Sequence, residues 1–105
     1  MPDNIALTEA VYYILLSLYQ PRHGYGIMQF VMEQSEGRVV LAAGTLYGAI
    51  NSLLEKGWIR PLPYEASARK KEYEITAAGK FAVNTELNRL RELLENGLRI
   101  TGGNI

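Results

Sequence analysis

The segment at residues 41–57, LAAGTLYGAINSLLEKG, is the feature that most constrains the fold of this chain. Its large apolar residues recur at intervals of four, three and one, so a helix places all of them on one side. These residues are Leu46, Ile50, Leu53 and Leu54. The opposite side has no carboxylate until the last turn. The pattern predicts a helix with one core face and one smooth, uncharged outer face.

That outer face carries small or hydrogen-bonding residues where an exposed helix usually has Lys and Glu. It consists of Gly44, Gly48, Asn51 and Ser52, flanked by Thr45 and Tyr47. A face of this kind allows a helix to lie close to phosphates and base edges. It would equally allow another helix to pack tightly against it. This segment alone leaves both interpretations open.

The length of 105 residues predicts a single domain with one modest core, which argues against an enzyme with an interdomain cleft. With 48% hydrophobic and 21% charged residues, wholesale disorder is not expected, and no apolar run is long enough to cross a bilayer. The chain lacks cysteine and shows no secretion signal, so we expect a cytoplasmic protein. Eleven basic and eleven acidic residues cancel, which leaves only local patches to bind a polyanion.

Two helices are expected before this segment. The first begins after Thr8 as its cap, reaches about Gln20 and is stopped by Pro21, with a loop at residues 21–24. The second spans residues 25–35 and ends near Gly37. Their core-facing residues are Leu7, Val11, Ile14, Leu15 and Leu18 in the first helix, and Ile27, Met28, Val31 and Met32 in the second. An extended connection is expected at residues 38–41.

The turn before the second helix contains His23, Gly24 and Gly26. No phosphate-binding strand, loop and helix pattern surrounds the glycines, so close packing and turn formation explain them better than ligand contact. His23 is the only histidine and has no second ligand or catalytic partner in the sequence, which favours a solvated turn residue.

Two short strand-like runs follow, at residues 58–64 and 71–76. In the second run, Tyr73 and Ile75 alternate with glutamates. Pro61 and Pro63 are two residues apart, so their nitrogens point to the same side, which can be an unpaired edge. The runs predict a hairpin whose tip is basic. That basic cluster consists of Arg69, Lys70 and Lys71.

A long last helix is expected from its cap Thr76 to about Asn96, with Gly97 as its stop and a frayed tail beyond. Apolar residues form a seam with a period of 3.5, and charged residues including Glu86 fill the other positions. The seam consists of Val83, Leu87, Leu90 and Leu94, widened by Leu93 and Phe81. Because no other long helix is available to form an intrachain pair, the seam predicts a homodimer.

Signatures of catalysis are absent from the sequence. It contains no nucleophile and base pair, zinc-ligand spacing, GxGxxG, Walker loop or clustered carboxylates. We therefore expect neither an enzyme nor a metal or cofactor site.

Three helices, a hairpin with a cationic tip and a final helix are the order of a winged helix-turn-helix module, in which the third helix enters the major groove. HGYGI at residues 23–27, GTLYGAINSLLEKGWI at 44–59 and RKKEYEITAAGK at 69–80 resemble the PadR family of transcriptional regulators. The expected fold is mainly α with a small β-hairpin. It divides into a DNA-binding domain at residues 1–76 and a dimerisation helix with its tail at 77–105.

The resemblance implies a homodimeric DNA-binding regulator that binds a palindromic operator in double-stranded DNA. Members of the family usually act as repressors, so we expect repression. The implied DNA contacts are Gly44, Thr45, Tyr47, Asn51 and Ser52 on the third helix, and Arg69, Lys70 and Lys71 on the wing. The family responds to small aromatic or hydrophobic effectors, for which Tyr12, Tyr13, Leu90 and Leu94 are the candidate lining.

The chain departs from the family pattern on its third helix. Members commonly carry proline at the positions of Ala43 and Gly48, and a basic pair at those of Asn51 and Ser52. Without that pair, up to two phosphate contacts per subunit are lost, which would weaken binding and flatten its salt dependence. A winged-helix module that binds a protein partner through the same face, without sequence-specific DNA binding, is the alternative.

Overall fold

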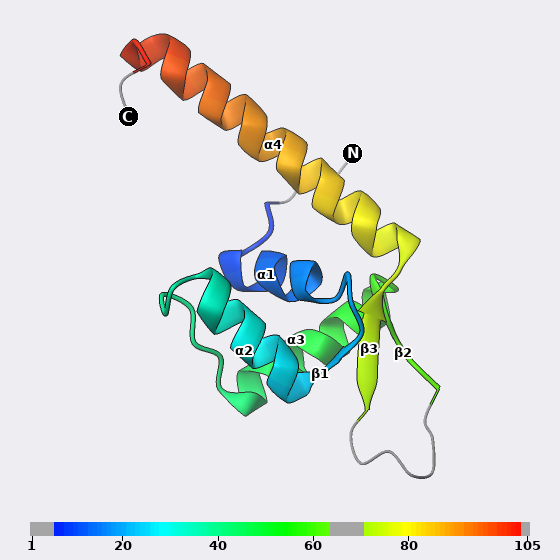
Figure 1. Ribbon diagram of the computed structural model, residues 1–105. Helices are drawn as coiled ribbons and strands as arrows, with labels where there is room; N and C mark the ends of the chain where they lie inside the picture. The colour runs from blue at the N-terminus through cyan, green and yellow to red at the C-terminus, as the bar shows by residue number, and fades with distance from the viewer. Residues whose placement is uncertain (1–5, 64–70, 104–105) are drawn as a thin grey trace.

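Figure 1 shows that the short N-terminal helices pack together beside a small sheet, while the long last helix crosses above the first helix and extends away from the rest of the chain. The computed structural model describes residues 6–63 and 71–103. Within these ranges the elements are α1 (Glu9–Ser17), β1 (Arg22–His23), α2 (Gly24–Gln34), α3 (Ala43–Lys56), β2 (Ile59–Pro61), β3 (Glu72–Ile75) and α4 (Ala77–Thr101). The expected order of helices and hairpin is confirmed.

One hydrophobic core joins the helices and the sheet. The predicted inner faces supply most of it. Its buried residues include Ile14 and Leu15 from α1, Leu18 directly after α1, Ile27 and Val31 from α2, and Leu46, Ile50 and Leu53 from α3. Leu7, Val11 and Met28 pack partly buried against this core, as does Leu54. Met32 is 43% exposed, contrary to expectation. Met32 is rotated by about 100° around the α2 axis from buried Val31, so it lies outside the buried face of the helix.

The predicted helix ends at Thr8, Thr76 and Gly57 are confirmed. The Thr8 hydroxyl accepts a hydrogen bond from the Val11 N–H at 3.1 Å, and Thr76 does the same for Gly79 at 3.1 Å. Gly57 ends α3 in the left-handed region with φ 74°. Gly97 does not end α4, which continues to Thr101 and closes at Gly102 with φ 85°. A single glycine costs a helix only about 1 kcal/mol, so it does not stop a helix whose flanking residues still favour one.

The sheet contains a strand that the sequence did not predict. Among the described residues it has three antiparallel strands in the order β1-β3-β2, with Arg22 opposite Tyr73 and Ile59 opposite Ile75. β1 occupies residues expected to form a loop. A strand of two residues shows no alternation, and it forms here because β3 supplies hydrogen-bonding groups beside it.

The prolines lie on an unpaired edge, as expected. β2 bonds only to β3 within the described sheet, and Leu62 extends the pairing by donating its N–H to the Glu72 carbonyl at 2.9 Å. The alternation in β3 is also confirmed, because Tyr73 and Ile75 are buried while Glu72 is exposed. The residues between these two strands, 64–70, fall outside the described part of the chain.

The segment at residues 38–41 forms no strand, and the Ser35 hydroxyl accepts the Val39 N–H at 2.9 Å to hold it against α2. The molecule is elongated, with extents of 57 × 33 × 21 Å, because α4 projects beyond the core (Figure 1).

Candidate nucleic-acid interface

The outer face of α3 is open to solvent. Gly44, Thr45, Gly48, Asn51 and Ser52 are all exposed, while the opposite side of the same helix is buried in the core. A Cβ atom added at Gly44 or Gly48 would meet no atom within 4 Å. Within the described chain, therefore, these glycines do not serve to pack another helix against α3. The face is available to a partner molecule.

The N-terminus of α3 differs from the other described helix starts. Side chains of Thr8, His23 and Thr76 cap α1, α2 and α4 by accepting a backbone N–H. Ala42 precedes α3 and offers no such side chain. No side chain of the described residues accepts the first N–H groups of α3, around Gly44 and Thr45, so an anion such as a phosphate can accept them.

Tyr47 lies at the edge of the open face, against the start of α2. Tyr47 is 45% exposed, and a Cβ atom at Gly24 would collide with its hydroxyl oxygen. Gly24 is therefore present because Tyr47 packs over it, which confirms the close-packing interpretation for that glycine. The hydroxyl of Tyr47 sits where the first turns of α2 and α3 approach each other.

A hollow of about 410 Å³ lies between these two helix starts and the sheet. It is lined by His23, Gly24, Tyr25, Met28, Ala43, Tyr47, Lys71 and Tyr73. Lys71, the one member of the predicted wing cluster within the described residues, therefore shares a surface with Tyr47 of α3. Burial raises the pKa of Tyr73, and the nearby Tyr47 adds to this effect. Arg69 and Lys70, also predicted to contact DNA, lie outside the described residues.

His23 is half-buried rather than a solvated turn residue. It belongs to β1, and its Nδ1 accepts the Gly26 N–H at 3.3 Å to cap α2. Sequence reasoning missed this role because histidine is an uncommon capping residue.

The predicted seam on α4 divides into a buried start and an exposed remainder. Val83 is 1% exposed and packs into the core of its own chain. Leu87, Leu90 and Leu94 are 40%, 39% and 56% exposed. Phe81 is 73% exposed, but it lies two residues before Val83 and thus on the opposite side of the helix, so it does not widen the seam as expected.

Glu86 is a buried residue that the sequence analysis placed among the charged, outward positions. It is 5% exposed, forms two hydrogen bonds with Arg89 at 2.9 and 2.6 Å, and accepts the Leu7 N–H at 3.4 Å. Hydrogen bonding to Arg89 holds the pKa of Glu86 below its ordinary value. Its spacing, three residues after Val83 and four before Leu90, was a signal that it shares their side.

The candidate effector residues lie on α1 and α4. Tyr12 and Tyr13 are half-buried, with ring centroids 5.9 Å apart and planes tilted by 58°. Burial raises the pKa of Tyr12, and the Glu86 carboxylate raises it further, which places Tyr12 beside α4. Leu90 and Leu94 lie one and two turns farther along that helix. Tyr12 therefore lies at the junction of the core with α4.

No group of three or more His, Cys, Asp or Glu residues in the described ranges could hold a metal ion. The described helices also include none that is long and apolar enough to span a membrane.

Solved structures share this fold. A PadR family transcriptional regulator from Eggerthella lenta DSM 2243 is 20% identical, covering 90% of this chain and 82% of that chain, with a TM-score of 0.69. A PadR family regulator from Clostridium difficile R20291 is 18% identical over 89% and 98% of the two chains, with a TM-score of 0.67. RosR of H. salinarum is 25% identical over 95% and 97%, with a TM-score of 0.68. No curated protein matches this chain.

A family model described as the transcriptional regulator PadR-like family matches residues 13–85. These residues include the core, the open face of α3, the hairpin and the buried start of α4. The family consists of transcriptional regulators, in agreement with the expectation of a non-enzymatic, DNA-binding protein. This chain belongs to the PadR-like family of transcriptional regulators.

Proposed function

We propose that this chain is a cytoplasmic, homodimeric repressor that binds a palindromic operator in double-stranded DNA. The open face of α3 is the observation that carries the proposal. It combines glycines with free space beyond them, an N-terminus without a side-chain cap, and the exposed amide of Asn51. A helix of this kind can approach base edges, and an Asn amide can pair with adenine.

The charge for phosphate contacts comes from the wing. Lys71 lines the same hollow as Tyr47, so a DNA backbone that crosses this hollow can meet an ammonium group and a phenol hydroxyl together. Arg69 and Lys70 are the neighbouring cations in sequence, and we include them in the contact set. Gly44 and Thr45 would contribute backbone N–H groups, and Ser52 its hydroxyl.

Dimerisation through α4 follows from its exposed leucines. Leu87, Leu90 and Leu94 share one side of α4 and are 39–56% exposed among the described residues, and a second copy can cover them. We propose that residues 1–76 bind DNA and that residues 77–105 form the dimer interface. The two α3 helices are then expected about 34 Å apart, one turn of the duplex.

Repression and release by a small hydrophobic or aromatic effector complete the proposal. Support comes from the position of Tyr12 beside Glu86, where the core meets α4. An effector held by Tyr12, Tyr13, Leu90 and Leu94 would change the angle between the two DNA-binding domains.

The proposal is tested by selecting bound fragments from a genomic DNA pool with purified protein. We expect a palindromic sequence to be enriched. The triple variant Arg69→Ala, Lys70→Ala, Lys71→Ala should then bind every sequence more weakly. The slope of log affinity against log salt concentration should become shallower by up to about 0.9 for each lost phosphate contact. An unchanged salt slope would remove the wing from the mechanism.

A protein-interaction module is the second candidate, favoured by the zero net charge and by the uncharged side chains of Asn51 and Ser52. It predicts that no DNA fragment is enriched in the selection.

A further inference from the structure

The hollow between the starts of α2 and α3 and the sheet contains a phenol hydroxyl that has no partner within the described chain. Tyr73 lines this hollow and is only 8% exposed, and its hydroxyl forms no hydrogen bond with the described residues. None of those residues has a side-chain oxygen or nitrogen that is both fully buried and unpaired, so this hydroxyl still reaches solvent through the hollow. A hydroxyl in such a place favours a partner molecule that accepts its proton.

Three other side chains of the hollow can donate hydrogen bonds. The Tyr47 hydroxyl lies at its edge. The His23 ring accepts the Gly26 N–H at Nδ1, so it carries a proton on Nε2 that it can donate. The Lys71 ammonium forms no ion pair with a carboxylate of the described residues. Lys71 precedes Tyr73 by two residues, and this spacing places both side chains on the same face of an extended chain.

The start of α3 adds backbone donors beside the same hollow. Ala43, the first residue of α3, lines the hollow, and no side chain of the described residues caps this helix. The positive end of the helix dipole therefore lies next to the four side-chain donors. The described lining residues include no Asp or Glu. Donors gathered without a carboxylate favour an anion as the ligand.

The size and the walls of the hollow narrow the class of anion. Its volume of about 410 Å³ lies within the range of about 300–1,000 Å³ found for small-molecule sites, so it can hold more than an inorganic ion. Met28 and the tyrosine rings supply carbon surface beside the donors. A sugar phosphate suits both features, because its terminal phosphate oxygens can accept several hydrogen bonds while the sugar packs against the rings.

We propose that the hollow binds a free sugar phosphate, whose phosphate oxygens accept hydrogen bonds from these donors. The backbone of DNA repeats the same chemical unit, a sugar that carries a phosphate. A free sugar phosphate therefore occupies the place proposed for the DNA backbone and lowers DNA affinity by direct competition. The competition rests on the proposed function, whereas the binding of the free ligand does not.

Titration with ribose 5-phosphate, without DNA, tests the site by itself. The backbone amide signals of Gly24 and Ala43, at the two helix starts, should shift and saturate. Ribose should bind at least about tenfold more weakly, because it lacks the phosphate. Tyr73→Phe keeps the ring in the core and removes only the hydroxyl, so it should weaken ribose 5-phosphate binding by about tenfold. Lys71→Met should weaken it by about fivefold or more, through the lost attraction between ammonium and phosphate.

Tyr19→Phe and Lys80→Met are the matched controls. The Lys80 ammonium lies 5.5 Å from the centre of the Tyr19 ring, so these residues also combine a phenol with a cation. Neither residue lines the hollow. The affinity for ribose 5-phosphate should therefore stay unchanged in both variants. No saturable binding to wild type, equal binding of ribose, or full affinity in Tyr73→Phe would overturn the site.

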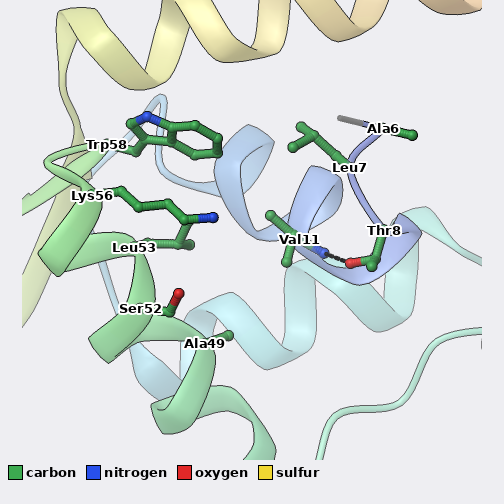
Figure 2. Close-up of a pocket in the computed structure, with 9 residues that line it drawn as sticks. All are labelled: Ala6, Leu7, Thr8, Val11, Ala49, Ser52, Leu53, Lys56 and Trp58. Atoms are coloured by element: carbon green, nitrogen blue, oxygen red, sulfur yellow. Dashed lines mark hydrogen bonds between the residues drawn. The ribbon is translucent and has the colours of Figure 1, made fainter. Parts of the chain in front are cut away.

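A separate cavity beside Lys56 tests whether the ligand is confined to the hollow. Figure 2 shows this cavity between the start of α1, the second half of α3 and Trp58. None of its lining residues lines the hollow. The amide signals of Val11 and Ala49, which belong to this cavity, should therefore stay unchanged during the titration. Shifts confined to these signals would overturn the assignment to the hollow.

Competition is measured with a DNA fragment from the genomic selection. Ribose 5-phosphate at about ten times its Kd should raise the apparent Kd for DNA by about tenfold in wild type, and by only about twofold at the same concentration in Tyr73→Phe. Potassium chloride of equal ionic strength is the reference, because salt alone also weakens DNA binding. A DNA affinity equal to that in the reference would overturn the competition. Saturable ribose 5-phosphate binding by a protein that binds no DNA would overturn the proposed function and leave the site.

Discussion

α3 and α4 are both amphipathic helices in the sequence, yet they expose opposite kinds of surface. α3 buries its large apolar residues and leaves small, uncharged residues in solvent. α4 buries Val83 and Glu86 near its start and then exposes Leu87, Leu90 and Leu94. The face of α3 suits close approach of a polar partner. The leucines of α4 are unfavourable in water and are stabilised when an apolar partner covers them. The two helices are therefore suited to different partners.

The largest effect is expected where the leucines of α4 are replaced by charges. Leu87→Asp together with Leu90→Asp should give monomers in sedimentation, because each carboxylate would have to be buried against an apolar partner at a cost of several kcal/mol. Phe81→Asp is the matched control, since Phe81 lies on the opposite side of the same helix, and it should remain dimeric. A dimer that survives the double substitution would assign the interface to another surface.

Glycines distinguish the packed start of α4 from the open face of α3. A Cβ atom at Gly79 would collide with the Trp58 carbonyl oxygen, which also accepts the Thr76 N–H, and would lie 2.6 Å from Ile75 Cγ1. Gly79→Ala should lower the free energy of unfolding by about 1–3 kcal/mol. Gly48→Ala has open space beyond it and should raise this free energy by up to about 1 kcal/mol. Thermal unfolding of both variants measures the difference, and a stable Gly79→Ala protein would refute the packing described for α4.

A smaller effect is expected at Glu86. Its folded pKa lies below the ordinary value, so the carboxylate stabilises the fold above the unfolded pKa of about 4.3, and this stabilisation is lost as the pH falls through the folded pKa. Glu86→Gln should lower the free energy of unfolding by about 1 kcal/mol at neutral pH, with the gap to wild type closing in acid. Denaturant unfolding at several pH values tests this. Exposed Glu92→Gln serves as control, and a gap that is independent of pH would contradict the assignment.

Helix periodicity and capping residues predicted most of the fold. The inner faces of α1 and α3, the caps at Thr8 and Thr76, and the edge position of the prolines follow from local rules that the structure obeys. β1 could not be predicted, because a strand of two residues exists only through its partner β3. Gly97 was wrongly assigned as a helix end, because the sequence does not show that the following residues continue the helix.

The candidate site was predictable in its exposed part and not in its contacts. The face of α3 could be assigned from spacing alone. That Tyr47 packs over Gly24, that His23 caps α2 and that Glu86 holds Leu7 depend on residues brought together by the tertiary fold. The cavity beside Lys56 has the same origin, since α1, α3 and Trp58 meet there from distant parts of the chain.

One measurement tests the central role of the α3 face most directly. It compares the affinity of wild type, Gly48→Ala and Gly48→Glu for a selected DNA fragment over a range of salt concentrations. Both substitutions point into open space, so neither should unfold the chain. We expect the alanine variant to bind within a few-fold of wild type, and the glutamate variant to lose about tenfold or more at low salt, because its carboxylate would face phosphates. Equal affinity of all three proteins would show that DNA does not contact this face.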